Sequence, residues 1–222
     1  MKKTIGFVLN PVAGVGGRVG LKGSDGVVEE AFRRGGREVS PGRAEEFFSA
    51  FNPEVFNEAL FLTCSGKMGE EVIKKFTENY GVVYFPADDK TTSLDTKNAC
   101  ENFLSRNCDL ILFCGGDGTA RDVSSAAGVK VPVLGIPSGV KMYSSCFAVT
   151  PEAAAKVAGD FIFGKTSLKD AEILDIDEGE YRMDRMSVKF FSHVKTPYVS
   201  GYVQGAKAVF LSQDEERAKA QL

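Results

Sequence analysis

The segment Gly115-Gly116-Asp117-Gly118-Thr119 constrains the fold of this chain more than any other stretch. It follows residues 109–114, a short apolar run of the kind that a parallel sheet buries on both faces. It precedes residues 120–127, whose short side chains are compatible with a helix. A strand, a glycine-rich turn and a helix N-terminus together predict an α/β unit in which free backbone N–H groups face an anion.

The aspartate in the middle of this turn points to a specific chemistry. Gly115, Gly116 and Gly118 let a phosphate approach the backbone closely, because glycine carries no Cβ. A carboxylate beside a phosphate is repulsive unless a cation bridges the two groups or the carboxylate serves a hydroxyl. The turn therefore fits a phosphotransferase. The simpler alternative is a tight turn in which Asp117 caps the following helix.

Strand-like and helix-like segments alternate through the first 165 residues, as in βαβ units on a mainly parallel sheet. The predicted strands are residues 4–9, 59–64, 82–85, 110–114 and 131–136. The predicted helices are residues 27–34, 68–80, 94–105, 120–127 and 151–163, the last with Thr150 as N-cap. We expect an α/β fold whose Rossmann-like nucleotide-binding domain, residues 1–165, has helices on both faces of its sheet. Extended segments at residues 172–176 and 186–191 predict that residues 166–222 begin a smaller β-rich domain.

Two more loops follow predicted strands, and strand carboxyl ends are where open α/β sheets bind ligands. The first begins at Asn10 and carries a glycine at every third position from Gly14 to residue 26. Its cations, Arg18 and Lys22, are solvated charges in the simpler interpretation. For Asn10 the alternative to ligand binding is a plain Asn-Pro turn.

The second of these loops spans residues 135–141. Its Ser138 hydroxyl can hydrogen-bond a phosphate or a ribose hydroxyl, and Lys141 supplies a positive charge. We expect Ser138 and Gly139 to line the ligand site. Like the glycine-rich turn, this loop would lie at the carboxyl edge of the sheet.

Charged side chains near the glycine-rich turn are further candidates. Arg121 could meet a transferred phosphoryl group, and Asp122 could orient that group or help to hold a divalent ion. Asp175 and Asp177 share one face of an extended segment and could bind a metal, although solvation explains them more simply. We assign no metal ligands.

Residues 159–166 match the P-loop pattern G-x-x-x-x-G-K-[ST] by coincidence. A phosphate loop of that type needs a strand before it, whereas a helix precedes this one and residues 161–163 are apolar. Farther upstream, Thr92 and Asp95 are first of all helix-capping residues.

Composition excludes several classes of protein. The 222 residues carry a net charge of −3 with positive and negative residues interspersed. The sequence therefore shows no cluster of basic residues of the kind that binds nucleic acid. No apolar run approaches the length of a membrane span, and we expect no signal peptide and a cytoplasmic location. The five cysteines form no CxxC pair and are predicted to be buried reduced thiols. His193 is the single histidine, and no Cys/His cluster is present that could form a structural zinc site. The sequence also lacks the G-x-S-x-G motif that a Ser-His-Asp hydrolase would need beside this histidine.

The motifs GGDGTARDV (residues 115–123) and GIPSGVKM (residues 135–142), with the opening NPVAG (residues 10–14), resemble the predicted ATP-NAD kinase group that includes AcoX-like proteins. That group belongs to the superfamily of NAD kinases, diacylglycerol and sphingosine kinases and 6-phosphofructokinases. The resemblance covers roughly residues 4–210. It implies a kinase that phosphorylates the ribose 2′-hydroxyl of NAD with ATP or polyphosphate, while Mg²⁺ screens the phosphate charge.

The resemblance also implies roles for particular residues. Asp117 would accept the proton of the attacking hydroxyl, while Lys141 and Arg121 would stabilise charge on the transferred group. The nucleotide-binding residues would be Asn10, Gly14, Gly115, Gly116, Gly118, Thr119, Ser138 and Gly139. Members of the group usually continue beyond this point into more β structure, so residues 166–222 would be a truncated segment, either because the chain is a fragment or because it is naturally truncated. We also expect a homo-oligomer without nucleic-acid or membrane partners.

Two departures from the family pattern keep the substrate open. Pro137 stands where NAD kinases have the Asn of G-x-N-x-G, and their later Asn-Glu pair is not evident. A lipid kinase of the diacylglycerol or sphingosine type is one alternative, although Arg121-Asp122 replaces the Asn-Glu that usually follows GGDGT there. A non-catalytic nucleotide-binding sensor is the other.

Overall fold

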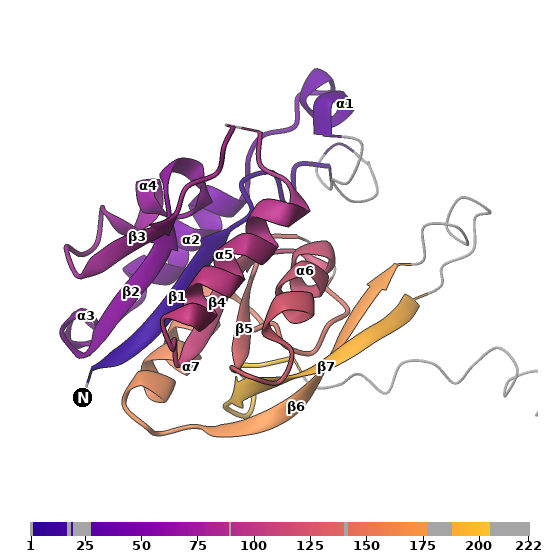
Figure 1. The fold of residues 1–222 in the computed structure, drawn as a ribbon. Helices are drawn as coiled ribbons and strands as arrows, with labels where there is room; N and C mark the ends of the chain where they lie inside the picture. Colours follow the sequence, from indigo (N-terminus) through magenta and orange to yellow (C-terminus); the bar gives the residue numbers. More distant parts are fainter. Residues whose placement is uncertain are drawn as a thin grey trace, which may run out of the picture.

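The computed structural model describes residues 2–16, 19, 28–88, 90–139, 142–176 and 188–204. Five parallel strands form its central sheet in the order β3-β2-β1-β4-β5 (Figure 1). They are β1 (Lys3–Leu9), β2 (Ala59–Cys64), β3 (Tyr80–Tyr84), β4 (Leu110–Gly115) and β5 (Val133–Pro137). Strand β4 is buried along its whole length, as its apolar run predicts. The Rossmann-like α/β fold class is confirmed.

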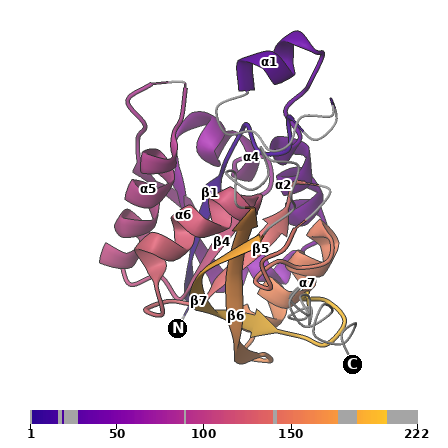
Figure 2. The ribbon, with the colours of Figure 1, turned by 90° about the vertical axis from the view of Figure 1, so that its right-hand side faces the viewer.

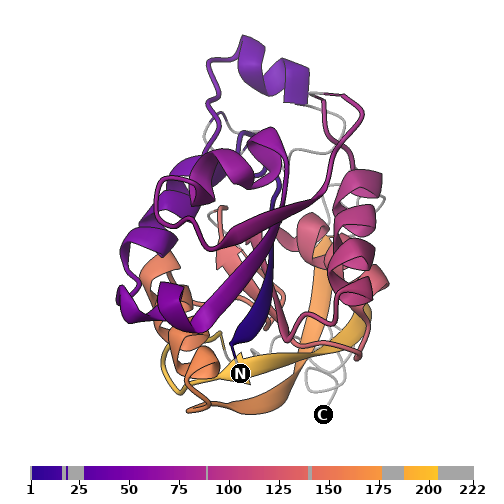
Figure 3. The same ribbon diagram turned by 60° about the vertical axis from the view of Figure 1, so that its left-hand side comes forward.

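Helices cover both faces of the sheet (Figure 3). Helices α2 (Ser40–Ser49), α3 (Glu54–Glu58), α4 (Glu70–Ile73) and α7 (Pro151–Ile162) pack on one face. Helices α5 (Ser93–Ser105) and α6 (Asp117–Ala127) pack on the other. Two further helical segments of the described residues are α1 (Val28–Arg33) and the 3-10 turn η2 (Gly66–Met68). Within the described residues, no helix combines the length and the apolar character needed to cross a membrane.

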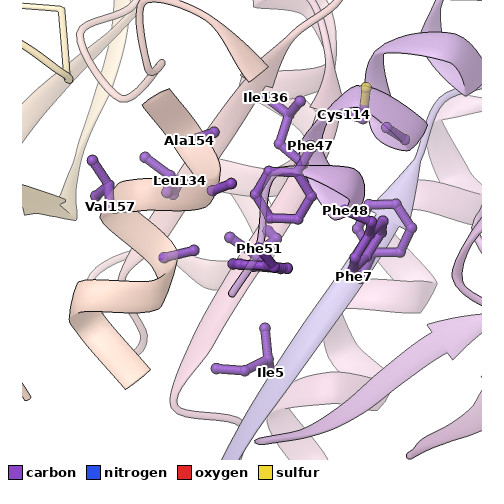
Figure 4. Packing of buried hydrophobic residues seen from close by; sticks show 14 of the residues in the cluster. Ile5, Phe7, Phe47, Phe48, Phe51, Cys114, Leu134, Ile136, Ala154 and Val157 are labelled. Atoms are coloured by element: carbon purple, nitrogen blue, oxygen red, sulfur yellow. The ribbon is translucent and has the colours of Figure 1, made fainter. Parts of the chain in front are cut away.

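Aromatic side chains fill the core beneath α2 (Figure 4). Phe47 and Phe48 of α2 are essentially inaccessible to solvent. The Phe48 ring meets the edge of Phe7 from β1, with centroids 4.9 Å apart, and also contacts Phe61 of β2. These contacts fix α2 against β1, the strand that leads into the Asn10 loop. All five cysteines are buried and free of disulfide bonds.

The predicted helices differ from the structure over residues 68–80, and α2 and the short α3 were not predicted. The predicted helix over residues 68–80 is wrong, because only Glu70–Ile73 is α-helical and β3 already begins at Tyr80. Gly69 has φ +148°, and the Thr77 hydroxyl accepts a hydrogen bond from the Asn79 N–H, which favours a turn. Helix α2 was not predicted, although Ala44, Phe47, Phe48 and Phe51 have helical spacing.

Downstream of α7, the chain forms a two-stranded antiparallel hairpin of β6 (Ser167–Ile176) and β7 (Val188–Tyr198). Figure 2 shows the hairpin beside α6, and Ala171, Ile173 and Val194 join the buried cluster that contains Ala120 and Val123 of α6. The extended segments predicted here are confirmed over residues 172–176 and 188–191, and residues 186–187 lie outside the described part of the chain. The division of the chain at residue 165 stays a prediction.

Candidate active site at the carboxyl edge of the sheet

The strand order reverses direction between β1 and β4, which are adjacent in the sheet although far apart in sequence. From β1 the chain moves outward to β2 and β3, and from β4 it moves to β5 on the other side. Asn10 continues the pairing past β1, because its N–H donates to the Cys114 carbonyl at 3.0 Å. Ligands of open α/β sheets bind at such a reversal, outside the carboxyl ends of the strands.

Asn10 connects the loop after β1 to the turn after β4. Its Nδ2 donates to Thr119 Oγ1 at 3.0 Å, and its Oδ1 accepts the Val12 N–H at 3.2 Å. The second contact closes an Asx-turn, which fixes the side chain in place. The structure thus brings together Asn10 and the GGDGT segment, as the sequence predicts, through a contact between side chains 109 positions apart.

Contacts of Gly14 and Ser138 bring the loop after β5 next to the Asn10 loop and the GGDGT turn. Gly14 has φ +81°, and a Cβ there would lie 2.5 Å from the Ser138 carbonyl oxygen. Only glycine fits such a position. The Ser138 N–H in turn donates to the Gly115 carbonyl at 3.1 Å. The loops after β1, β4 and β5 therefore converge on one another, and Gly139 follows in the third.

The start of α6 is open toward this meeting point. A Cβ at Gly115 would strike the Thr119 side chain at 2.4 Å, whereas a Cβ at Gly116 would meet no atom within 4 Å. Gly116 is the N-cap and forms no side-chain cap, so the first N–H groups of α6, including that of Gly118, have no helical partner. Backbone donors at an uncapped helix start attract anions.

Asp117 does not cap α6, so the simpler alternative for this residue is wrong. Its Oδ1 accepts the Ser144 N–H at 2.9 Å, and its Oδ2 accepts the Tyr143 N–H at 2.8 Å. Only 9% of the residue is exposed. Burial raises the pKa of Asp117 above the ordinary value of 3.8, and hydrogen bonding by the Ser144 side chain and by the N–H groups of Ser144 and Tyr143 opposes part of that rise. The carboxylate is thus held firmly and is more basic than a solvated aspartate.

Ser138 is the other unusual polar residue of the site. It is 4% exposed, and its Oγ has no hydrogen-bond partner. Within the described part of the chain, only one other side-chain polar atom, Thr196 Oγ1 in β7, shares this condition. A buried hydroxyl without a partner is costly. A phosphate oxygen or a ribose hydroxyl bound where the loops meet would satisfy it.

Arg121 and Asp122 contact neighbouring elements. Arg121 Nη1 lies 3.1 Å from Asp175 Oδ2 in β6, and its guanidinium lies 5.4 Å from the centre of the Phe191 ring. Asp122 Oδ1 lies 3.5 Å from Lys97 Nζ of α5. The catalytic role of Arg121 stays a prediction.

Several candidates fall outside the described residues, namely Lys141, Arg18, Lys22 and Asp177. Among the residues that are described, no group of three or more His, Cys, Asp or Glu side chains could hold a metal ion. Gly159 of the coincidental P-loop match lies inside α7, whose cap is formed by Thr150 Oγ1 accepting the Ala153 N–H.

Sequence analysis missed Tyr143 and Ser144, the partners of Asp117. They lie 26 and 27 positions downstream of it, in a segment without strand or helix periodicity. The consecutive hydroxyl residues Tyr143, Ser144 and Ser145 were the only available signal, and local hydrogen bonding explains such runs equally well.

Comparison with known proteins identifies the family of this chain. Three solved structures from Bacillus anthracis str. Sterne, one described as a diacylglycerol kinase and two as a "putative diacylglycerol kinase", resemble the chain at 16% sequence identity, with TM-scores of 0.38, 0.38 and 0.37. The matched region covers 78–79% of this chain and 45–46% of theirs, so the chain spans less than half of their length. No curated protein matches it. The family model described as ATP-NAD kinase N-terminal domain matches residues 5–166, and the chain therefore belongs to that family.

Proposed function

We propose that this protein is a kinase of the NAD kinase type, which transfers a phosphoryl group from ATP or polyphosphate to the ribose 2′-hydroxyl of NAD. One observation carries the proposal: three loops converge on the uncapped start of α6, beside the buried Ser138 hydroxyl that has no partner. Free N–H groups and an unsatisfied hydroxyl suit a phosphate, and Gly116 leaves room for its close approach.

Each residue then has a defined task. The backbone at Gly115, Gly116, Gly118 and Thr119 binds phosphate oxygens, while Ser138 and Gly139 contact the same ligand from the loop after β5. The Asn10 side chain hydrogen-bonds Thr119, and the absence of a Cβ at Gly14 leaves room for the Ser138 backbone. When bound, Mg²⁺ would neutralise the charge of the phosphates.

Asp117 acts as the general base. It takes the proton of the 2′-hydroxyl, the hydroxyl oxygen forms a bond to the terminal phosphorus of the donor, and the bond from that phosphorus to its bridging oxygen breaks, so that ADP or a polyphosphate shortened by one unit leaves. A pKa raised by burial favours this task, because a base works best when its pKa lies closer to the working pH. Positioning and charge neutralisation supply the rest of the catalysis, with Arg121 and Lys141 as the proposed cations.

A product assay tests the proposal. The purified chain is incubated with Mg²⁺, a phosphate donor (ATP or polyphosphate) and either NAD or a panel containing diacylglycerol and sphingosine, and products are identified by mass spectrometry. We expect phosphorylation of NAD at the 2′-hydroxyl. Phosphorylated lipid would identify a lipid kinase instead, and ATP binding without any product would favour a sensor.

The Ser138 hydroxyl gives a sharper test of the phosphate site. Because this hydroxyl forms no hydrogen bond, Ser138→Ala should leave the free energy of unfolding unchanged or raise it by up to about 1 kcal/mol. The same substitution should weaken ATP binding by roughly tenfold, since one hydrogen bond to the ligand is lost. Calorimetric titration measures the affinity, and denaturant unfolding measures the stability.

Thr196→Val is the matched control for Ser138→Ala. It removes the other buried hydroxyl without a partner, in β7 and away from the three loops. We expect a similar gain in stability and unchanged ATP affinity. Equal ATP affinity in all three proteins would remove Ser138 from the binding site.

A further inference from the structure

Ser144 joins the GGDGT carboxylate to a distant part of the chain. The residue is completely buried and its N–H donates to Asp117 Oδ1 at 2.9 Å. Its hydroxyl donates to the Leu174 carbonyl at 2.9 Å and accepts the Leu174 N–H at 3.0 Å. The Ser144 side chain thus satisfies both backbone groups of Leu174 in β6, while the Ser144 backbone N–H binds the Asp117 carboxylate.

Ser145 pairs with the same strand in a similar way. Its N–H donates to the Glu172 carbonyl at 2.9 Å, and its Oγ accepts the Glu172 N–H at 2.8 Å. The two serines therefore line one edge of β6 as a short pseudo-strand. They differ in one respect: among the contacts of the described residues, the Asp117 carboxylate is held by Tyr143 and Ser144, and not by Ser145.

A second contact links the same elements farther along α6. Arg121 lies one helical turn after Asp117 and pairs with Asp175, the residue that follows Leu174 in β6. Asp117, Ser144, β6 and Arg121 thus form a closed ring of contacts between α6 and the hairpin. Any shift of β6 relative to α6 would move the backbone that holds the carboxylate.

We propose that Ser144 is a positioning residue of the active site, through which the β6–β7 hairpin sets the orientation of Asp117. The inference rests on the proposed function, in which Asp117 is the base. Without the Ser144 hydroxyl, the backbone at residues 143–144 loses its attachment to Leu174, and the two N–H groups no longer keep their places against the carboxylate. Proton transfer depends steeply on such placement.

Other ionisable groups around Asp117 are the same in the test variants. Cys146 lies in the same loop, and both burial and the Asp117 charge raise the pKa of its thiol. Arg121 lies on α6 and contacts Asp175 and Phe191 of the hairpin, and Tyr143 adjoins Ser144. Since neither serine is charged, replacing one changes the Asp117 environment through hydrogen bonds and position alone.

The test compares Ser144→Ala with Ser145→Ala, each of which removes one hydroxyl from β6. The titration of Asp117 is followed by carbon-13 NMR of the aspartate carboxyl carbons, and turnover of NAD is measured over a range of pH. In Ser144→Ala we expect the pKa of Asp117 to rise by about one unit, because hydrogen bonds to the ionised form weaken. Turnover should fall about tenfold at a pH where Asp117 is ionised. In Ser145→Ala both quantities should match those of the unchanged protein.

An equal shift of the Asp117 titration in both variants, or a shift in neither, would overturn the proposal. The NMR measurement shows whether the titration of Asp117 depends on Ser144 even if the chain phosphorylates no substrate. A failure of the proposed function is therefore distinguishable from a failure of this inference. If Ser144→Ala does not fold, Ser144→Cys and Ser145→Cys replace the pair, because a thiol keeps the shape with a weaker donor.

Discussion

Replacing Asp117 by asparagine is expected to lower turnover by at least roughly a hundredfold, as the loss of a general base should. The fold should persist with a free energy of unfolding reduced by about 1–3 kcal/mol, since the new amide nitrogen would face a backbone N–H of residues 143–144. ATP affinity should change little. Steady-state kinetics, denaturant unfolding and calorimetry measure these three quantities.

Asp109→Asn is the matched control for this variant. Asp109 Oδ2 accepts the Thr4 N–H at 2.8 Å, and its Oδ1 contacts Lys3 Nζ at 2.9 Å, at the opposite edge of the sheet. It is thus a second carboxylate that clamps backbone, far from the proposed chemistry. We expect a comparable loss of stability with normal turnover. Near-normal turnover in Asp117→Asn would remove Asp117 from the role of base.

The pH dependence of turnover follows from the same residue. Proton acceptance requires ionised Asp117, so turnover should fall as the pH is lowered through its pKa. Because burial raises that pKa, the acid limb of the profile should lie above the ordinary value of 3.8. Asp117→Asn should abolish this limb in whatever activity remains.

Gly116→Ala is the second substitution with a large expected effect. A Cβ at Gly116 meets no protein atom within 4 Å, and the residue has φ −113°, so the fold should accept alanine. The added methyl group would occupy the space through which a phosphate reaches the start of α6. We therefore expect unchanged stability, but ATP affinity lowered by at least roughly tenfold, the equivalent of one good hydrogen bond.

Gly42→Ala serves as the control. Its Cβ also meets no atom within 4 Å, but it lies in α2 and away from the three loops. It should leave ATP affinity unchanged and raise stability by about 0.5–1 kcal/mol, because alanine is the better helix former. Unchanged ATP affinity in Gly116→Ala would mean that the phosphates do not approach the start of α6.

Local sequence patterns predicted most of the sheet. The central strand at residues 59–64 has the predicted bounds, and the ends of the other central strands differ by at most two residues, because apolar runs before turns are a local signal. Helix α2 was not predicted because Pro41 and Gly42 are residues typical of turns. Proline is nevertheless also favoured in the first turn of a helix, where Pro41 lies. The helix predicted over residues 68–80 failed for the opposite reason: its composition favours a helix, but tertiary contacts turn the chain into β3.

The convergence of the three loops at the candidate site was predictable from the sequence, whereas the contacts within the candidate site were not. A glycine-rich turn after a buried strand, with two more loops after strands, placed Asn10, Gly14, Thr119 and Ser138 at one edge of the sheet. The partners of Asp117 and Arg121 come from residues 143–144 and from β6. These contacts depend on how the hairpin packs against α6, and the residue pattern of a short stretch of sequence does not predict such packing.

Hydrogen exchange with and without ATP and Mg²⁺ tests most directly whether nucleotide phosphates bind where the three loops meet. We predict slower exchange of the backbone amides at residues 14–15, 116–119 and 138–139 together, because all three loops contact one another there. Residues 159–166, the coincidental P-loop match in and after α7, should not change. Protection at residues 159–166, or protection at none of the three loops, would contradict a phosphate site at the start of α6.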